Sequence, residues 1–313
     1  MKSFTLTVLA ACWGTANANP LWGRATAAIT SAQLTDFELF SQYAGAAYCT
    51  NVVQDTATTL IECEANGGAC AKVEANAAFV LDSFYQVGSQ LTTGYIGIDP
   101  TNNLIVVAFQ GTPGFDSAQL LDDLEIYRDD TTICGSADTN DSCEIHSGFL
   151  SAWNEVQSLV ETALVAAIAA YPSYGLVFTG HSMGAAIAAI GATVERNAGY
   201  VIDLYTFGQP RLGSVDISNY ITNQAPALGS NYRMTDYNDI IPQLPTHVYL
   251  FGKEWDHYTP EYYIDINGTD ITTADIQVIT TPLFSTAGNS GWSLVDSSIT
   301  AHREYFGYIS ACS

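Results

Sequence analysis

The stretch from Leu176 to Asn197, LVFTGHSMGAAIAAIGATVERN, limits what this chain can fold into more than any other. An apolar run ends in Gly-His-Ser-Met-Gly, and an alanine-rich run of high helical propensity follows at once. The pattern predicts a buried strand over 176–179, a sharp turn at Ser182 and a helix from Met183 to about Glu195. The alternative interpretation is a small-residue turn that joins two core elements, because the pentapeptide by itself is weak evidence.

The two glycines of this turn fit a strained change from strand to helix. Ser182 would adopt a strained backbone conformation, and a side chain at Gly180 or Gly184 would crowd the neighbouring elements. The strain would lift the serine hydroxyl clear of the sheet. The free N–H groups at the start of the following helix, that of Met183 first, could then stabilise an oxyanion. The turn therefore predicts a reactive serine.

Strands and helices alternate through the centre of the chain. Helical spacing is expected at 35–48, 149–171 and 183–195. Strands are expected at 92–98, 104–109, 176–179, 201–210 and 232–236, and the strand-rich last third adds 247–252, 261–266 and 275–280. This order predicts an α/β fold with a central, mainly parallel sheet, helices on both faces and antiparallel extensions near the C-terminus. No linker marks a second domain, so we expect one domain over 31–313.

The N-terminus has the pattern of a secretory signal. Residues 1–18 contain one lysine, an apolar run and the small-residue sequence Ala-Asn-Ala, which predicts cleavage after Ala18. The alternatives are a buried helix or a membrane anchor, but the apolar run is too short to span a bilayer. Residues 19–30 are then a possible propeptide or a flexible N-terminus. We expect a secreted, extracellular protein without a transmembrane segment.

The cysteines support this compartment. One of the seven lies in the signal, and an even number in a secreted chain is most simply three disulfides. Zinc is the alternative, but no Cys-x-x-Cys or paired histidine spacing supports it. Six cysteines allow about 15 pairings. Proximity in sequence favours Cys63 with Cys70 and Cys134 with Cys143, which leaves Cys49 for Cys312.

The charge of the chain limits its partners. Nine basic against 32 acidic residues give a formal net charge of −23, so its field should repel nucleic acid and anionic membrane surfaces. Two Asn-x-Ser/Thr sequons in a secreted context predict glycosylation at Asn140 and Asn267.

A reactive serine needs a base and an acid that orients the base. In this architecture both follow the serine in the chain, the acid first. The candidate bases are His247, His257 and His302, and the candidate acids are Asp236 and Asp239. Spacing alone chooses none of them. A second oxyanion donor is expected after the strand at 104–109, where Thr112 offers a backbone N–H and a hydroxyl.

Eight segments in this order resemble the fungal secreted lipases of the class 3 family, which also contains mono- and diacylglycerol lipases and feruloyl esterases. The segments are SQYAGAAYC, LIVVAFQGT, CEIHSGF, YPSYGLVFTGHSMGAAIA, LYTFGQPRLGS, YRMTDYNDIIPQLP, PEYY and AHREYFG. The resemblance implies an α/β-hydrolase fold with a short helical lid.

The resemblance also implies roles for single residues. The nucleophile is Ser182, the acid is Asp239 of the Asn-Asp-Ile-Ile-Pro segment, and the base is His302 of the Ala-His segment. The oxyanion donors are Thr112 and Met183. Structural roles are implied for His146 and His257. A long-range bridge in the family matches the pair Cys49–Cys312.

The segment after Thr112 decides between substrate classes. It lacks the tryptophan that many of the lipases carry in the lid. A short helix there could nevertheless present an apolar stripe formed by Phe115, Leu120, Leu121 and Leu124. Such a lid could cover the serine in water and lie on a lipid surface. The alternative is an ordinary surface helix whose apolar side faces the core.

The resemblance therefore implies a secreted serine ester hydrolase that acts on acylglycerols at a lipid–water interface, without metal or cofactor and without an obligate protein partner. A feruloyl-type or short-chain esterase with the same three catalytic residues is the alternative. A more remote alternative is a lipid- or carbohydrate-binding relative without activity. The presence of all the expected catalytic and oxyanion residues argues against it.

Overall fold

The computed structural model describes residues 28–54, 58–63, 69–113, 127–135, 142–247, 254–281 and 285–312. Several sequence predictions concern other parts of the chain. The leader 1–18, the segment 19–27, the lid residues Phe115, Leu120, Leu121 and Leu124, and the sequon at Asn140 all lie outside the described residues.

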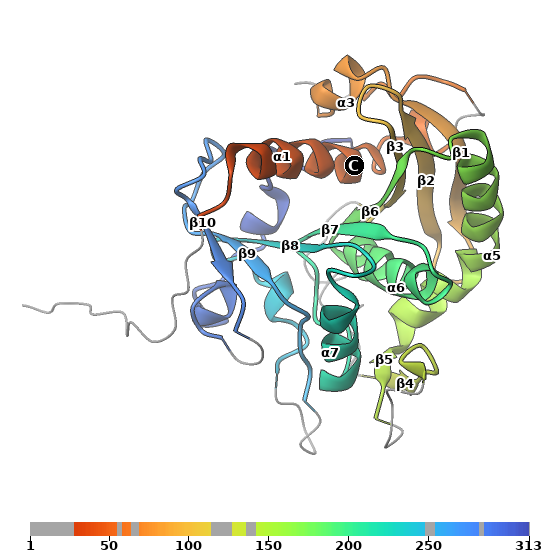
Figure 1. Ribbon diagram of the computed structural model, residues 1–313. Coiled ribbons are helices and arrows are strands. Elements are labelled where there is room, and N and C mark those ends of the chain that lie inside the picture. Colours follow the sequence, from red (N-terminus) through yellow and green to blue (C-terminus); the bar gives the residue numbers. More distant parts are fainter. Residues whose placement is uncertain are drawn as a thin grey trace, which may run out of the picture.

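One sheet of eight strands forms the centre of the molecule, in the order β1-β2-β3-β6-β7-β8-β9-β10 (Figure 1). The strands are β1 (Phe79–Val87), β2 (Thr92–Asp99), β3 (Leu104–Phe109), β6 (Gly175–His181), β7 (Ile202–Phe207), β8 (Asn231–Asp236), β9 (Glu261–Ile264) and β10 (Ile276–Ile279). Neighbours from β3 to β9 pair in parallel, and β1, β2 and β10 are antiparallel additions at the two edges. The predicted mainly parallel sheet is confirmed.

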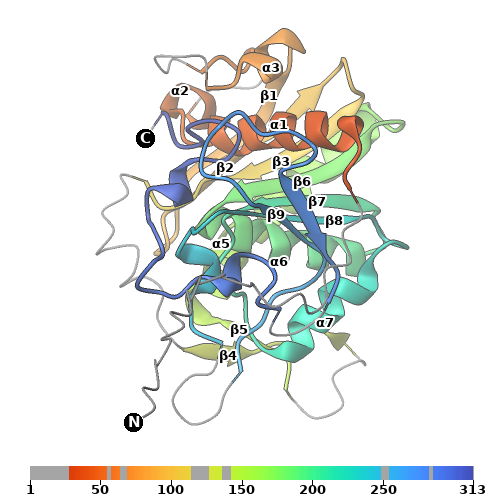
Figure 2. The ribbon, with the colours of Figure 1, turned by 90° about the vertical axis from the view of Figure 1, so that its left-hand side faces the viewer.

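Helices cover both faces of this sheet. The helix α1 (Ser31–Ala46) packs on one face, where it contacts β3, β6 and β7. The other face is covered by α5 (Ser147–Ala170) and α6 (Met183–Asn197), with α7 (Val215–Gln224) packed beside α6. Figures 1 and 2 show these two layers with the sheet between them. Each layer encloses its own cluster of buried apolar side chains.

Shorter elements complete the described fold. They are the helices α2 (Thr50–Val53) and α3 (Ala71–Ala75), the strand pair β4 (Arg128–Asp130) and β5 (Glu144–His146), and the 3-10 turns η2 (Ile241–Gln243), η3 (Asn289–Gly291) and η4 (Ala301–Arg303). The turns η2 and η4 carry or adjoin residues of the candidate site.

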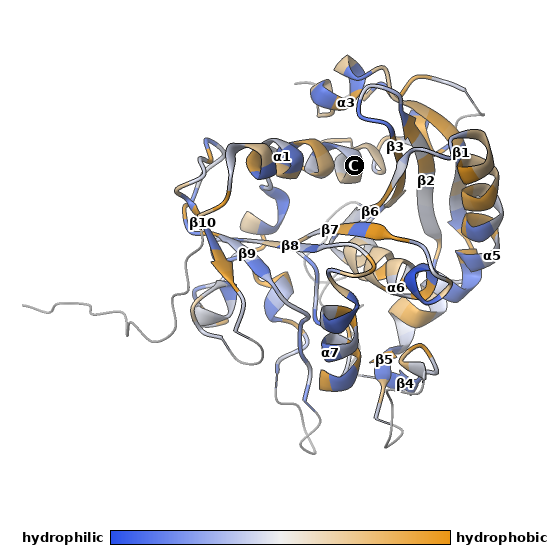
Figure 3. Ribbon diagram, viewed as in Figure 1, coloured by the Kyte–Doolittle hydropathy of each residue, from blue (hydrophilic) through white to orange (hydrophobic). Residues whose placement is uncertain are grey.

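The central helix α6 differs from the peripheral helices in its burial. Twelve of its fifteen residues are buried, because the run of alanines lets it lie close under β3, β6 and β7. In Figure 3 the outer helices α5 and α7 show hydrophobic stretches interrupted by hydrophilic ones, as helices with one exposed face do. The core thus fixes the start of α6, which is where the serine lies.

Some elements differ from the sequence-based expectations. The first helix begins at Ser31, four residues before the expected start, because Thr30 and Gln33 form a capping box. The strand β1 and the helix α7 were not predicted. The composition of α7 gives little helical signal, but Ser214 caps it and Ile217 is buried beneath it.

Three disulfides link the described chain. They are Cys49–Cys312, Cys63–Cys70 and Cys134–Cys143. The last two are the pairs that proximity in sequence favoured, and the first is the pair that remained. The first spans a sequence separation of 263 residues and ties the end of α1 to the C-terminal segment. That segment also carries His302, so this bridge helps to place a residue of the candidate site.

Candidate active site

Ser182 occupies a strained turn between β6 and α6. Its φ of 57° and ψ of −129° are unusual for a residue with a side chain. A Cβ atom on Gly180 would lie 2.3 Å from the carbonyl oxygen of Gly184, and one on Gly184 would lie 2.3 Å from that of Phe109. Both glycines are therefore required by close backbone contacts. The Oγ of Ser182 is buried and makes no hydrogen bond to the described residues.

His302 and Asp239 form a buried pair at the same end of the sheet. The Nδ1 of His302 lies 2.8 Å from Oδ2 of Asp239, and both side chains are fully buried. Two further donors bind this carboxylate: the hydroxyl of Tyr305 bonds to Oδ2 at 2.6 Å, and the N–H of Ile241 bonds to Oδ1 at 2.9 Å. The carboxylate is thus fixed from three sides and can orient the imidazole.

The backbone beside Ser182 makes direct contact with this pair. The N–H of Ser182 donates to the carbonyl of Phe207, the last residue of β7. The next residue, Gly208, has a φ of 58°, and a Cβ atom there would lie 2.7 Å from Cε1 of His302. Only a glycine lets the chain pass this close to the imidazole.

His181, the neighbour of Ser182, links the turn to the same histidine by a second route. Its Nε2 lies 2.7 Å from the carbonyl oxygen of His302, and its Nδ1 lies 2.8 Å from the hydroxyl of Tyr48. The rings of His181 and His302 lie 4.5 Å apart. Burial and the neighbouring His302 hold the pKa of His181 well below its usual value, so this ring is neutral. His181 therefore supports the site structurally.

The segment after β3 approaches the serine from another side. A Cβ atom on Gly111 would lie 2.9 Å from Cβ of Ser182, so the backbone of Gly111 is in contact with the serine. The adjacent Thr112 has a buried Oγ1 that makes no hydrogen bond to the described residues. A polar atom left in this condition is costly unless a ligand satisfies it. Thr112 therefore presents a hydroxyl next to this contact that the described residues leave without a partner.

A cavity of about 490 Å³ opens beside these residues. Its described lining comes from the β1–β2 hairpin, the segment after β3, the start of α5 and Met183. Its volume lies within the range of small-molecule sites, and Thr112 and Met183 are part of its lining.

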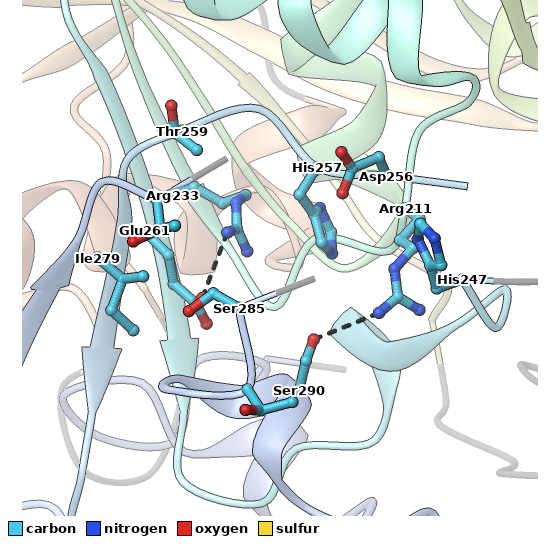
Figure 4. A pocket seen from close by; sticks show the side chains of 12 residues that line it. Arg211, Arg233, His247, Asp256, His257, Thr259, Glu261, Ile279, Ser285 and Ser290 are labelled. Atoms are coloured by element: carbon cyan, nitrogen blue, oxygen red, sulfur yellow. Dashed lines mark hydrogen bonds and ion pairs between the residues drawn. The ribbon is translucent and has the colours of Figure 1, made fainter. Parts of the chain in front are cut away.

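The two alternative bases, His247 and His257, lie in another place. They line a separate cavity of about 190 Å³ together with Arg211, Arg233 and Asp256 (Figure 4). His257 bonds through Nε2 to the carbonyl of Pro242, and His247 bonds through Nδ1 to the carbonyl of Trp255.

Electrostatics keeps these two histidines neutral as well. Burial, followed by the charges of Arg233 and Arg211, holds the pKa of His257 well below its usual value. The pKa of His247 is lowered mainly by burial. Neither ring lies with the serine, so the structure leaves His302 as the histidine at the site.

Asp236, the alternative acid, is close to the pair but unsuited to its task. Burial, followed by the charges of Asp239 and Glu304, raises its pKa to about 9. A carboxyl group that stays protonated at neutral pH cannot stabilise an imidazolium ion. His146 is also separate from the pair: it caps the start of α5 and stacks on Phe149 at 4.0 Å.

Comparison with known proteins gives a consistent result. Residues 106–249 match the family model described as Lipase (class 3). The chain is 34% identical over 286 residues to a secreted mono- and diacylglycerol lipase A of Penicillium cyclopium, covering 90% of this chain and 88% of the relative. The chain belongs to the class 3 lipase family. A secreted mono- and diacylglycerol lipase 1 of Fusarium solani is 33% identical over 91% of this chain and 79% of its own length.

Solved structures agree with the fold of this class 3 lipase. A mono- and diacylglycerol lipase from Aspergillus oryzae superposes with a TM-score of 0.78 at 31% identity, over 90% of this chain and 99% of that one. The expected α/β-hydrolase fold and the identity as a lipase enzyme are confirmed. In the described part of this class 3 lipase, no helix is long and apolar enough to cross a membrane.

Sequence reasoning missed two residues of this class 3 lipase site. Tyr305 bonds to the Asp239 carboxylate, and Gly208 lets the chain pass His302. Both lie inside segments that carry the family resemblance, AHREYFG and LYTFGQPRLGS, which was the one available signal. The sequon residue Asn267 is exposed on the turn between β9 and β10.

Proposed function

We propose that this lipase is a secreted serine hydrolase that cleaves acylglycerols at a lipid–water interface. The observation that carries the proposal is the 2.8 Å contact between His302 Nδ1 and Asp239 Oδ2, beside the strained turn of Ser182. The names of the Penicillium and Fusarium relatives support mono- and diacylglycerols as substrates.

The proposed reaction proceeds through an acyl-enzyme. Nε2 of His302 takes the proton of Ser182, whose Oγ forms a bond to the ester carbonyl carbon. Asp239 accepts the Nδ1–H bond and stabilises the charged ring. Thr112 and the N–H of Met183 donate to the oxyanion. The bond to the glyceride alcohol then breaks, and the alcohol takes the proton from His302. A water molecule repeats these steps on the acyl-enzyme and releases the fatty acid.

Ser182→Ala tests the proposal. The variant should lose hydrolysis of emulsified mono-, di- and triglycerides and labelling by an organophosphonate, while it folds like the wild-type protein. Hydrolysis at a comparable rate would exclude Ser182 as the nucleophile. Measuring the hydrolysis rate of a short-chain ester below and above its solubility limit distinguishes the two alternatives. A jump in the rate when an emulsion forms indicates a lipase, and the absence of a jump indicates an esterase for soluble esters.

We also infer how the chain matures. Residues 1–18 are removed on secretion, and residues 19–27 are a propeptide. The catalytic domain begins three residues before the predicted position 31, because Ala28 pairs with Gln277, Ile29 is buried in the core and Thr30 caps α1. Asn140 and Asn267 carry glycans. N-terminal sequencing and peptide mass spectrometry of the secreted protein test these points, and an intact Met1 in the medium would contradict them.

A further inference from the structure

The turn that follows β8 and carries Asp239 has a strained backbone. It begins at Asp236, the last residue of β8, and the N–H of Asp239 closes it with a 2.8 Å bond to the carbonyl of Asp236. Tyr237 within this turn has a φ of 25°, which residues with side chains rarely adopt. Such residues keep their conformation only where the surrounding structure holds them. The turn therefore depends on contacts from outside it.

A buried asparagine from the C-terminal part of the chain supplies such contacts. Nδ2 of Asn289 donates to the carbonyl of Asp239 at 2.8 Å, to that of Tyr237 at 3.2 Å and to that of Asp236 at 3.3 Å. The side chain lies in the core, since Asn289 is 1% exposed. An amide nitrogen carries two hydrogens, so at least one of them is shared between two carbonyl groups. One side chain thus binds three carbonyl groups of a single turn.

The chain that follows Asn289 binds the same turn and then leads to the base. The N–H of Ser298 donates to the carbonyl of Asn238 at 2.8 Å, and the side-chain amide of Asn238 donates to the carbonyl of Asp296 at 2.7 Å. This segment continues into η4, which carries His302. Asn289 is therefore the buried end of a contact between the turn that supplies the acid and the segment that supplies the base.

Asn289 is itself held in position from two sides. Its N–H donates to Oε1 of Glu261 on β9 at 3.2 Å, and its carbonyl accepts from Nε2 of Gln243 at 3.3 Å. The fit is close, because a Cβ atom on the preceding Gly288 would lie 2.5 Å from Oε2 of Glu261. That carboxylate also lies 3.6 Å from Nη2 of Arg233, in the arginine-lined cavity of Figure 4. The amide is thus fixed by the core independently of any substrate.

The two halves of the amide differ in their contacts. Oδ1 of Asn289 is buried and makes no hydrogen bond to the described residues, which costs stability. A side chain that served only to fill space would avoid this cost by being apolar. What the position requires is therefore the donor group at Nδ2. Neither leucine nor ionised aspartate, both close to asparagine in size, offers a donor to the three carbonyl groups.

We propose that Asn289 is a positioning residue for the catalytic acid. Its amide holds the turn in the conformation that places the Asp239 carboxylate against the imidazole of His302. Asn289 acts through Asp239 and not on the substrate. This inference rests on the proposed ester hydrolysis by Ser182, His302 and Asp239, and it adds a residue on which the geometry of that reaction depends.

Asn289→Leu tests this role on a soluble ester, at a temperature below the unfolding transition of the variant. The kcat should fall by roughly 10- to 100-fold with little change in KM, because a displaced acid affects the reaction and not the binding of the ester. A carboxylate that has moved away from the imidazole stabilises the charged ring less. The acid limb of the kcat/KM profile should therefore move to lower pH, which a smaller fraction of folded enzyme would not cause.

Asn231→Leu is the matched control. Asn231 is also buried, but its amide donates to the carbonyl of Ile221 at the opposite end of β8 from Asp236. This variant should lose stability and keep the wild-type kcat and pH profile. Asn289→Ser keeps one donor on a smaller side chain, so it should show the same changes as Asn289→Leu to a lesser degree. It also provides the test if the leucine variant does not fold.

A double variant shows whether the effect passes through the acid. In an Asp239→Asn background, Asn289→Leu should lower kcat by less than about 3-fold, because the carboxylate that it positions is gone. Losses that multiply in the double variant overturn the positioning role. An unchanged kcat in Asn289→Leu overturns it too, as does a fall in kcat with the acid limb at its wild-type pH, while ester hydrolysis at Ser182 stands in each case. If Asp239→Asn alone keeps the wild-type rate, the proposed function fails instead.

Discussion

The hydroxyl of Tyr305 donates a 2.6 Å hydrogen bond to Oδ2 of Asp239, the same oxygen that lies 2.8 Å from Nδ1 of His302. The tyrosine oxygen also accepts a bond from the N–H of Asp236 at 3.1 Å. Tyr305 is therefore a buried connection between the end of β8 and the histidine–carboxylate pair. Its position suits a residue that orients the Asp239 carboxylate.

Tyr305→Phe should lower kcat by about 10-fold, because a bond to a charged group contributes roughly 1.5 to 3 kcal/mol and Asp239 keeps its other donors. A carboxylate with one donor fewer favours the charged ring more strongly, so the acid limb of the kcat/KM profile should move to higher pH. Tyr308→Phe is the control, since Tyr308 is half exposed and bonds only weakly to Arg303 at 3.3 Å. A drop in stability with an unchanged pH profile would indicate a purely structural role.

Asp236→Asn should change how stability depends on pH. Burial raises the pKa of Asp236 from 3.8 to about 9, so between these values the folded protein holds a proton that the unfolded chain has lost. Wild-type stability should therefore fall with rising pH relative to the variant, by at most about 1.4 kcal/mol per pH unit, and level off above pH 9. Urea unfolding of both proteins from about pH 5 to about pH 8 measures this. Parallel stability curves would contradict it.

Thr112→Val should lower kcat by on the order of 100-fold with little change in KM, because its Oγ1 would donate to the oxyanion that forms only during reaction. Thr112→Ser keeps the hydroxyl and is the matched control, so it should retain most of the activity. Steady-state kinetics on one soluble ester measures both. Equal losses in the two variants would mean that the methyl group, and not the hydroxyl, is what matters.

Gly184→Ala should remove activity and destabilise the protein by about 1 to 3 kcal/mol. The added Cβ would lie 2.3 Å from the carbonyl oxygen of Phe109, so the end of β3 would have to move, and the following Thr112 with it. Gly175→Ala is the control at the start of β6, where the new atom meets only the flexible side chain of Leu104 at 3.3 Å. Full activity of Gly184→Ala would contradict the close contact.

The disulfides should differ in their contribution to stability. In the chain-entropy model, a bridge across 263 residues contributes roughly 5 kcal/mol and one across 7 residues roughly 2 kcal/mol. Replacing Cys49 and Cys312 by alanine should therefore lower the free energy of unfolding by more than replacing Cys63 and Cys70. Denaturant unfolding of the two double variants compares them. A larger loss for the short bridge would contradict the entropic explanation.

Much of the fold could be predicted where the signal is local. The strand, turn and helix around Ser182 depend on residues within a few positions of each other, and so do the two short disulfides. The edge strand β1 and the helix α7 could not be predicted in this way. Only four of the ten residues of α7 are buried, and the helix is stabilised by the Ser214 cap and by packing on α6.

The sequence by itself was enough to predict the turn at Ser182 and the order of the candidate catalytic groups along the chain. The family resemblance then selected one histidine and one aspartate among these groups. The spacing of residues in the sequence did not distinguish between the three candidate histidines or between the two candidate aspartates. Only the tertiary structure decided which of these groups meet. It brings His302 to Asp239 across 63 residues and places His247 and His257 in the arginine-lined cavity. The physical reason is that contact between side chains far apart in the sequence depends on the order of the strands in the sheet and on loop backbones such as that of Gly208. A tight turn depends only on the residues next to it in the sequence.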